Sequence, residues 1–171
     1  KHGRSGALVF VKVRHEHRRH DEDDPAVTEF QDIVYREAQH EADAPAPPTP
    51  AAMDGAWRRD LLPDEVLLFR YSALTFNGHR IHYDRPYATL TEGYPGLVVH
   101  GPLIATLLLD LLRRERPDAE LAAFQFKALR PSFDGNRLTV QGRPSADGRS
   151  VRLWACDHEG WLTMDATARI R

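Results

Sequence analysis

The decapeptide TFNGHRIHYD at residues 75–84 concentrates side chains that can transfer protons or carry charge. His82 is the candidate general acid and base, because an imidazole with an ordinary pKa of about 6.5 can take up and release a proton at neutral pH. Asn77 cannot carry a proton, but its amide can orient a water molecule or an imidazole. Alternatively, Asn77 and Gly78 form a tight turn, for which Asn-Gly is a common dipeptide.

The charged residues of the same segment each have two alternative roles. Asp84 can assist His82 in proton transfer, or it can cap a following helix, because an Arg-Pro pair comes directly after it. Arg80 and Arg85 can each bind a distal carboxylate of a substrate through two parallel hydrogen bonds, or they can lie at the surface.

The nine histidines of the chain do not predict a metal site. His79 and His82 have the spacing His-x-x-His, but they lack a third ligand on one helix face and no cysteine lies nearby. His15 and His17 share one face of a predicted strand, where their neighbours are arginines. We therefore expect no bound metal.

The apolar pattern predicts the elements that must position this loop. Residues 65–75, EVLLFRYSALT, favour a strand before the loop, and residues 86–92 favour a short helix after it. Residues 98–117 predict a long helix that is apolar nearly all round, with Pro102 in its first turn and arginines in its last turn. Such a helix must be enclosed, which favours a sheet wrapped around it.

Four strand-like runs follow this helix, at residues 121–130, 137–143, 150–157 and 161–170. The turn sequences FDGN, SADG and DHEG separate them. One buried helix followed by an antiparallel meander is an α+β layout, with the helix lying across a curved sheet.

The amino-terminal part of the chain has a different composition. Residues 6–17 and 26–36 are rich in β-branched and aromatic types and predict a β-hairpin, which needs a further surface to pack against. Residues 38–56 hold four of the twelve prolines and few large apolar side chains, as linkers do. We therefore predict terminal strands of an incomplete domain at 1–37, a linker at 38–56 and a main domain at 57–171.

The bulk composition of the 171 residues is that of a globular protein, with 42% apolar and 28% charged residues. A net charge of −2 argues against a generic nucleic-acid binder. No apolar run is long enough to span a bilayer, and no secretory signal pattern opens the chain. The single cysteine, Cys156, cannot form an internal disulfide and fits a small core residue, so we expect a cytoplasmic protein.

Two segments resemble the MaoC-like hydratases and dehydratases, which have the hotdog fold. Residues 77–82, NGHRIH, resemble the loop Asp-x-Asn-Pro-x-His of that group, with Asn77 in place of Asp, and residues 99–101, VHG, resemble its helix start. LTFNGHRIHYD and YPGLVVHGPL are similar to the branch of hydroxyacyl-thioester dehydratases type 2, or FAS1-like dehydratases, which includes mesaconyl-CoA and itaconyl-CoA hydratases. Residues 57–171 carry this resemblance, and residues 3–37 resemble the last strands of an amino-terminal hotdog.

The resemblance implies a hotdog fold preceded by a partial second hotdog, and the addition or removal of water across the α,β double bond of an acyl-CoA thioester. A C5 dicarboxylyl group is one acyl candidate. The implied catalytic residues are His82, Asn77, Asp84 and Gly101, the last as an oxyanion donor through its N–H or, alternatively, a plain helix start. The implied substrate-binding residues are Arg80, Tyr83, Val99, His100, Lys127 and Arg130, with Lys127 and Arg130 facing the phosphates of coenzyme A.

The resemblance implies no cofactor besides the coenzyme A of the substrate. Because most of the first hotdog is absent, we expect either a truncated chain or a second copy that fills the gap, and a homodimer or pseudo-dimer of hotdog units. Two other functions fit the same fold. A non-catalytic hotdog would bind acyl-CoA or support a partner subunit, and a thioesterase would use an acid on the central helix, where Asp110 stands alone.

Overall fold

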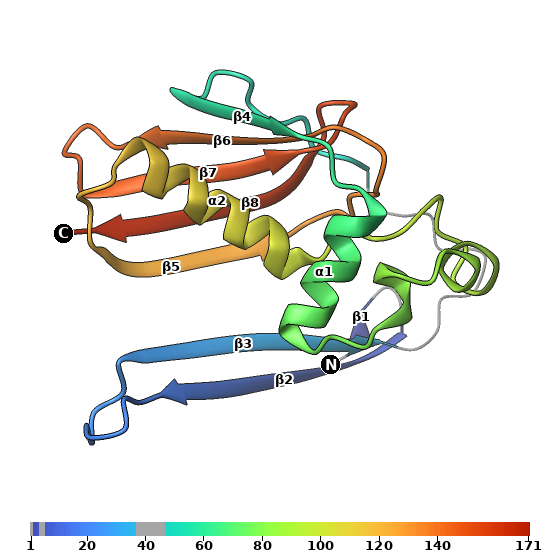
Figure 1. Cartoon of the computed structure of the whole chain (residues 1–171), viewed down its shortest axis with the longest axis horizontal. Coiled ribbons are helices and arrows are strands. Elements are labelled where there is room, and N and C mark those ends of the chain that lie inside the picture. The colour runs from blue at the N-terminus through green and yellow to red at the C-terminus, as the bar shows by residue number, and fades with distance from the viewer. Residues whose placement is uncertain (1, 4–5, 37–46) are drawn as a thin grey trace. The chain divides into compact units, whose positions relative to one another are not determined.

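The computed structural model describes residues 2–3, 6–36 and 47–171 (Figure 1). By contacts the chain divides into two compact units, Lys1–Pro47 and Pro48–Arg171. The linker predicted for 38–56 lies partly outside the described residues.

The first unit is a three-stranded sheet in the order β1-β2-β3. Strand β1 spans His2–Gly3, β2 spans Gly6–His17 and β3 spans Val27–Arg36. The antiparallel pairing of β2 with β3 confirms the predicted hairpin. Much of its apolar surface is exposed, including Val9, Phe10, Val27, Phe30, Val34 and Tyr35. A hairpin of this kind needs a partner surface to be stable in water.

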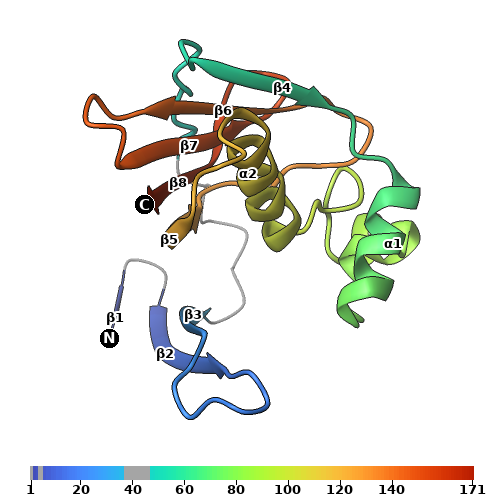
Figure 2. The same cartoon turned by 60° about the vertical axis from the view of Figure 1, so that its left-hand side comes forward.

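The second unit is built on a five-stranded antiparallel sheet in the order β4-β6-β7-β8-β5. The bounds of its strands are Trp57–Leu61 (β4), Leu121–Ala128 (β5), Leu138–Pro144 (β6), Ser150–Cys156 (β7) and Leu162–Ile170 (β8). Helix α2, Gly101–Glu115, lies across one face of this sheet (Figures 1 and 2). The α+β layout and the four strands after the helix are confirmed.

Helix α2 is enclosed as its composition predicts. Its buried residues are Leu103, Ile104, Ala105, Leu108, Leu111 and Leu112. They pack on buried side chains of the sheet, including Leu138, Val140, Val151, Leu153, Met164 and Ala166. Burial of a large aliphatic side chain contributes about 1.5–3 kcal/mol, so this interface holds the start of α2 in a fixed place.

The strand predicted for residues 65–75 is wrong, because this segment forms helix α1, Glu65–Thr75. Asp64 caps it: the Oδ1 atom of Asp64 accepts a hydrogen bond of 2.7 Å from the N–H of Leu67. Phe76 ends it in the left-handed conformation, with φ of 52°. The apolar run shows no strict alternation, and the fully buried positions Leu68 and Ser72 lie four residues apart, one helical turn.

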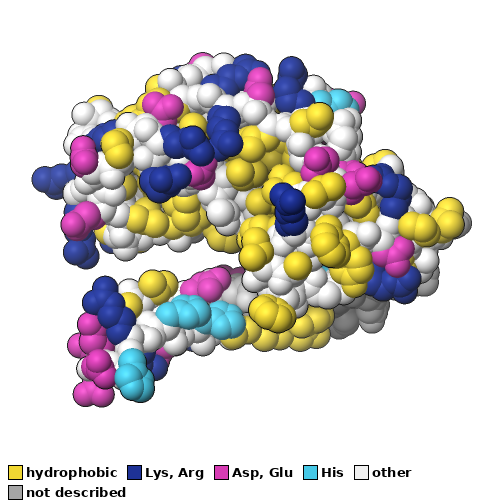
Figure 3. Space-filling model, in the orientation of Figure 1, with side chains coloured by type: hydrophobic (Ala, Val, Ile, Leu, Met, Phe, Trp, Pro, Cys, Tyr) yellow, Lys and Arg dark blue, Asp and Glu magenta, His cyan; other side chains and the backbone are white. Residues whose placement is uncertain are grey.

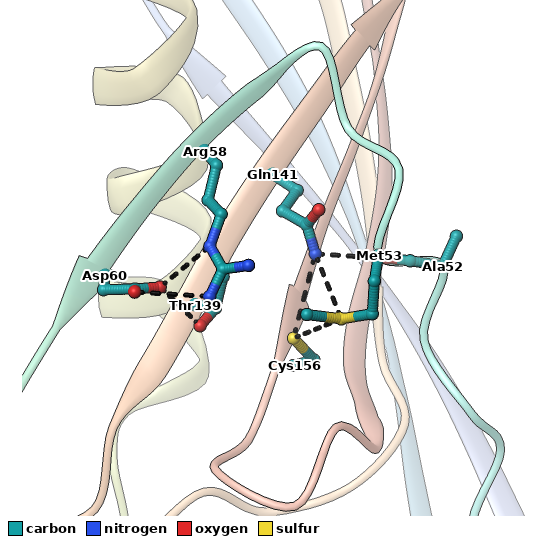
Figure 4. A network of polar contacts seen from close by, with 7 residues as sticks. All are labelled: Ala52, Met53, Arg58, Asp60, Thr139, Gln141 and Cys156. Carbon is teal, nitrogen blue, oxygen red and sulfur yellow. Dashed lines mark hydrogen bonds and ion pairs between the residues drawn. The ribbon is translucent and has the colours of Figure 1, made fainter.

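Strand β4 was not predicted, and residues 48–56 belong to the second unit by their contacts rather than to a linker. Gln141 of β6 fixes them. It donates to the Ala52 carbonyl at 3.1 Å (Figure 4). Its Oε1 also accepts from the N–H of Gly55 at 3.2 Å. Cys156 is buried beside Met53, which confirms the prediction of a core residue. The short helix predicted for 86–92 is confirmed as a π-helical turn, Tyr87–Thr91.

Candidate active site

His82 ends a short 3₁₀ turn, Arg80–His82, and is 8% exposed. Its Nδ1 lies 2.7 Å from the carbonyl oxygen of Val98. Because a carbonyl only accepts hydrogen bonds, Nδ1 must carry the proton, and Nε2 of the neutral ring therefore keeps a lone pair. Nε2 has no hydrogen-bond partner among the described residues. His82 is thus held in the tautomer that a general base requires.

The ring of His82 stacks on the ring of His100, with centroids 3.8 Å apart and planes 17° apart. His100 is fully buried, and its Nε2 lies 2.8 Å from Oγ of Ser72 in α1. His100 therefore packs between Ser72 of α1 and the His82 ring. The contact of Ser72 with His100 was not predicted from the sequence, because the segment of Ser72 was expected to be a strand.

Both imidazoles are shifted towards their neutral forms. Burial lowers the pKa of His100 from 6.5 to about 4, and the nearby charge of His82 adds to this effect. Burial also lowers the pKa of His82 below 6.5, as does His79, while the bond to Val98 opposes the shift. Near neutral pH His82 is therefore an unprotonated base.

Gly101 is the first residue of α2 and borders an open hollow of about 320 Å³. Apart from its two chain neighbours and the backbone of its own helix, no described atom lies within 4 Å of the place that a Cβ at Gly101 would occupy. The N–H groups of the first helical turn point outwards at the positive end of the helix dipole, which suits a developing negative charge. Val98 and Val99 line the same hollow. The carbonyl that orients His82 therefore belongs to a residue that lines the hollow, Val98.

Asp84 has the capping geometry that was one of its two expected roles. Its Oδ1 accepts from the N–H of Tyr87 at 3.1 Å, and its Oδ2 accepts from Arg80 at 2.6 Å. The Arg80 guanidinium holds the pKa of Asp84 below its usual range. An ionised carboxylate in this position stabilises the turn that carries His82, whereas its participation in proton transfer stays a prediction.

Asn77 has the turn geometry that was the alternative for this residue. Its Oδ1 accepts from the N–H of His79 at 3.0 Å, and its own N–H donates to the Ser72 carbonyl at 2.9 Å. Tyr83, which is exposed, donates its hydroxyl to the Gly78 carbonyl. The loop is therefore tied to itself and to the end of α1, and a direct role of Asn77 in catalysis stays a prediction.

A carboxylate that the sequence did not single out fixes the segment before α2. Asp134 accepts from the N–H of Leu97 at 2.8 Å and forms an ion pair with Arg85, which also pairs with Glu65 of α1. The N–H of Val98 in turn donates to the carbonyl of Ile81 at 3.0 Å. These contacts connect α1, the His82 turn and the wall of the hollow.

The two remaining predicted substrate-binding residues lie on or near β5. Lys127 is exposed on this edge strand, and Arg130 lines the hollow that Gly101 borders. Arg130 also lies 3.6 Å from Asp157 through its Nε atom.

Asp110, the acid that a thioesterase would use, is engaged elsewhere. Its carboxylate contacts Arg59, Arg113 and Arg114 at 2.6–2.8 Å, and the hydrogen bonds from Arg114 and Arg113 lower its pKa to about 2. The described residues contain no group of three histidine, cysteine, aspartate or glutamate side chains placed to hold a metal ion. Neither α-helix in the described part of the chain has the length and apolar character needed to cross a membrane.

The comparisons with known proteins identify the class. Residues 1–134 match the family described as hydroxyacyl-thioester dehydratase type 2, and the chain belongs to this family. The chain is 45% identical over 172 residues to mesaconyl-C(4)-CoA hydratase of Chloroflexus aurantiacus. That alignment covers 99% of this chain but only 59% of the relative, so the chain spans about three fifths of the length of the relative.

Solved structures confirm the hotdog fold. A MaoC-like dehydratase from Phytophthora capsici superposes with a TM-score of 0.73 at 14% identity, covering 98% of this chain and 60% of that one. The (R)-hydratase from A. caviae involved in PHA biosynthesis superposes with a TM-score of 0.60 at 19% identity, covering 70% of this chain and 98% of that one. The hotdog fold that the resemblance of residues 77–101 implied is therefore confirmed.

Proposed function

We propose that this chain catalyses the reversible addition of water to the α,β double bond of an acyl thioester. The observation that carries the proposal is the neutral His82 ring, which is fixed by the Val98 carbonyl, has a free Nε2, and lies beside the residue that precedes Gly101. Membership of the hydroxyacyl-thioester dehydratase family and the similarity to a mesaconyl-C(4)-CoA hydratase support it.

In the hydration direction, Nε2 of His82 takes a proton from water while the water oxygen attacks the β-carbon. The electrons of the double bond move towards the thioester oxygen, and the N–H of Gly101 donates to the resulting enolate. Removal of one such preorganised donor typically costs about 2.7–4 kcal/mol in the transition state. The imidazolium then returns a proton to the α-carbon, which gives the 3-hydroxyacyl thioester. His82 makes both transfers because the Asn77 amide cannot exchange a proton.

The proposed substrate is a coenzyme A thioester, with a C5 dicarboxylyl group as the first candidate because of the relative's name. Lys127, exposed on β5, is proposed to face the coenzyme A phosphates, for which a cation is the natural partner. No further cofactor takes part in this mechanism.

We propose that the hotdog unit pairs with a second hotdog, either from another copy or within one protein. Exposed apolar side chains support this arrangement. They gather over α1 (Figure 3), where Val66, Phe69, Leu74 and Phe76 are at least half exposed. Contiguous exposed apolar patches of this kind mark interaction surfaces. The buried free thiol of Cys156 is compatible with the proposed cytoplasmic location.

A non-catalytic hotdog that only binds acyl-CoA is the second candidate, and Asn77 in place of an acid favours it. The decisive experiment incubates the full-length gene product with a panel of enoyl-CoA thioesters. It follows the loss of conjugated enoyl absorbance together with the release of free thiol. Hydratase activity removes the absorbance without thiol release. Thiol release alone would instead establish a thioesterase, and binding without either change would establish the non-catalytic module.

A further inference from the structure

The plane of the His82 ring depends on a contact that the proposed mechanism does not yet use. The χ2 torsion of histidine is broad, so rotamer preference alone does not fix the ring plane. The hydrogen bond from Nδ1 to the Val98 carbonyl fixes one ring atom, and a carbonyl oxygen accepts such bonds over a wide range of directions. The His100 ring, stacked on the face of His82 with centroids 3.8 Å apart, supplies the missing constraint.

The His100 ring is itself fixed by two residues of α1. Its Nε2 lies 2.8 Å from Oγ of Ser72. The ring of Tyr71 meets it edge to face, with centroids 4.9 Å apart and planes 62° apart. Because His100 is fully buried as well, its ring has a single orientation against which His82 can stack.

Ser72 is also connected to His82 along the loop. Its carbonyl accepts from the N–H of Asn77 at 2.9 Å, and Oδ1 of Asn77 accepts from the N–H of His79 at 3.0 Å. The His79 carbonyl then accepts from the N–H of His82 at 3.2 Å. Through its side chain Ser72 therefore holds His100, and through its main chain it holds the turn that carries His82.

The proposed reaction makes a strict demand on this geometry. His82 transfers a proton twice, so its Nε2 must keep its direction while the ring changes charge. A displacement of about 1 Å in such a group can lower the rate by about 100-fold. The ring on its face must also stay uncharged when His82 becomes an imidazolium, and burial meets this need by lowering the pKa of His100 to about 4.

We propose that Ser72 and His100 are positioning residues for this reaction. The Ser72 hydroxyl fixes the His100 ring, and the stacked His100 ring fixes the plane of His82, so that Nε2 of His82 stays directed at the substrate. Neither residue touches the substrate or exchanges a proton with it. This inference rests on the proposed function.

The test compares three variants and a control in the full-length gene product. His100→Gln keeps an amide that can bond to Ser72 but removes the ring, and Ser72→Ala keeps the ring but removes its hydrogen bond. The double variant Ser72→Ala/His100→Phe keeps an aromatic ring and removes both polar partners. Ser145→Ala is the matched control, because Oγ of Ser145 bonds to Asp147 and to the Ser150 carbonyl in the turn between β6 and β7.

With mesaconyl-C(4)-CoA as the substrate, His100→Gln should lower kcat by about 10- to 100-fold. Ser72→Ala should lower it by about 3- to 10-fold, the usual effect of one hydrogen bond. KM should stay within about 2-fold in both, because neither side chain binds the substrate. The double variant should return kcat to within about 3-fold of the wild type, since replacing both partners leaves no unpaired polar group. Ser145→Ala should leave kcat unchanged even where its thermal stability falls.

Carbon-13 relaxation of the His82 ring, assigned by comparison with His82→Ala, measures the ring order without any turnover. We expect an ordered ring in the wild type and in the double variant, and a more mobile ring in His100→Gln and Ser72→Ala. The two single variants decide the question if the double variant does not fold.

An unchanged kcat in His100→Gln would overturn the proposal, and so would a loss of kcat with a His82 ring as ordered as in the wild type. An equal loss of kcat in Ser145→Ala would overturn it as well, because the effect would then follow from lost stability. If the wild type hydrates no thioester, the proposed function fails, but a mobile His82 ring in His100→Gln would still support the positioning contact.

Discussion

Titratable side chains have opposite charge states at the start of α2 and in its second half. Near Gly101, two stacked imidazoles are buried away from any carboxylate contact and are shifted towards neutrality. Around Asp110, one carboxylate lies against three guanidinium groups and is permanently ionised. Charges that are paired in this way stabilise the fold but cannot exchange protons near pH 7. We therefore expect proton transfer at the start of α2, where the imidazoles are neutral, and not around Asp110.

We expect His82→Ala to have the largest effect on activity among the variants that test this comparison. The loss of the base should lower kcat for enoyl thioester hydration by about 10²- to 10⁴-fold, the usual contribution of general acid–base catalysis. Binding of a saturated thioester should stay within about 3-fold, because the ring does not bind the substrate. Steady-state kinetics and isothermal titration calorimetry measure the two quantities. Full activity of His82→Ala would remove the histidine from the mechanism.

Gly101→Ala should lower kcat/KM by about 10-fold or more while leaving the fold intact. Outside its chain neighbours and its own helix backbone, a Cβ at this position meets no described atom within 4 Å, and alanine is a better helix former than glycine. The methyl group projects into the space where the thioester oxygen must approach the N–H. Thermal unfolding and kinetics distinguish the two effects, and a fully active, equally stable variant would contradict the close approach of the thioester oxygen at this residue.

The buried imidazoles also predict how stability depends on pH. Their folded pKa values lie below the unfolded value of 6.5, so the unfolded state binds more protons between these values. The free energy of unfolding should therefore decrease as the pH falls from 6.5 towards 4, with His100 alone contributing about 3 kcal/mol. His100→Gln should flatten this slope in urea titrations at several pH values. An equal slope in the variant would mean that folding does not shift the pKa of His100.

Asp110→Asn gives the smallest expected effect on activity. It should leave kcat within about 3-fold of the wild type, because Asp110 is occupied by arginines rather than by substrate. The free energy of unfolding should fall by about 1 kcal/mol as the ion-pair network loses its acceptor. A loss of activity comparable to that of His82→Ala would break the contrast between the two parts of α2 and revive the thioesterase hypothesis.

The sequence predicted the parts of the site that depend on local pattern. The resemblance of residues 77–82 and 99–101 to family motifs pointed to His82 and Gly101, whose catalytic roles stay predictions. The enclosed helix followed from apolar residues on all sides of residues 103–112. The contacts that determine the chemistry were not predictable in this way. The Val98 carbonyl that fixes the His82 tautomer lies sixteen residues further along the chain, so this contact depends on tertiary folding and not on a local pattern.

The wrong prediction for residues 65–75 had a consequence for the site. The apolar residues of 65–75 fit either a strand or a helix by their pattern. The capping residue Asp64 is the sequence signal that favours the helix. With a strand in place of α1, Ser72 could not be assigned to His100. The hydrogen bond between Ser72 and His100 shows that α1 fixes one ring of the stacked imidazole pair.

The most direct test is a nitrogen-15 NMR titration of the histidine side chains in the full-length gene product, with His82 assigned by comparison with His82→Ala. The account predicts that neutral His82 carries its proton on Nδ1, that Nε2 is unprotonated at pH 7, and that its pKa lies below 6.5. A ring protonated on Nε2 in its neutral form, or a pKa above 6.5, would contradict it.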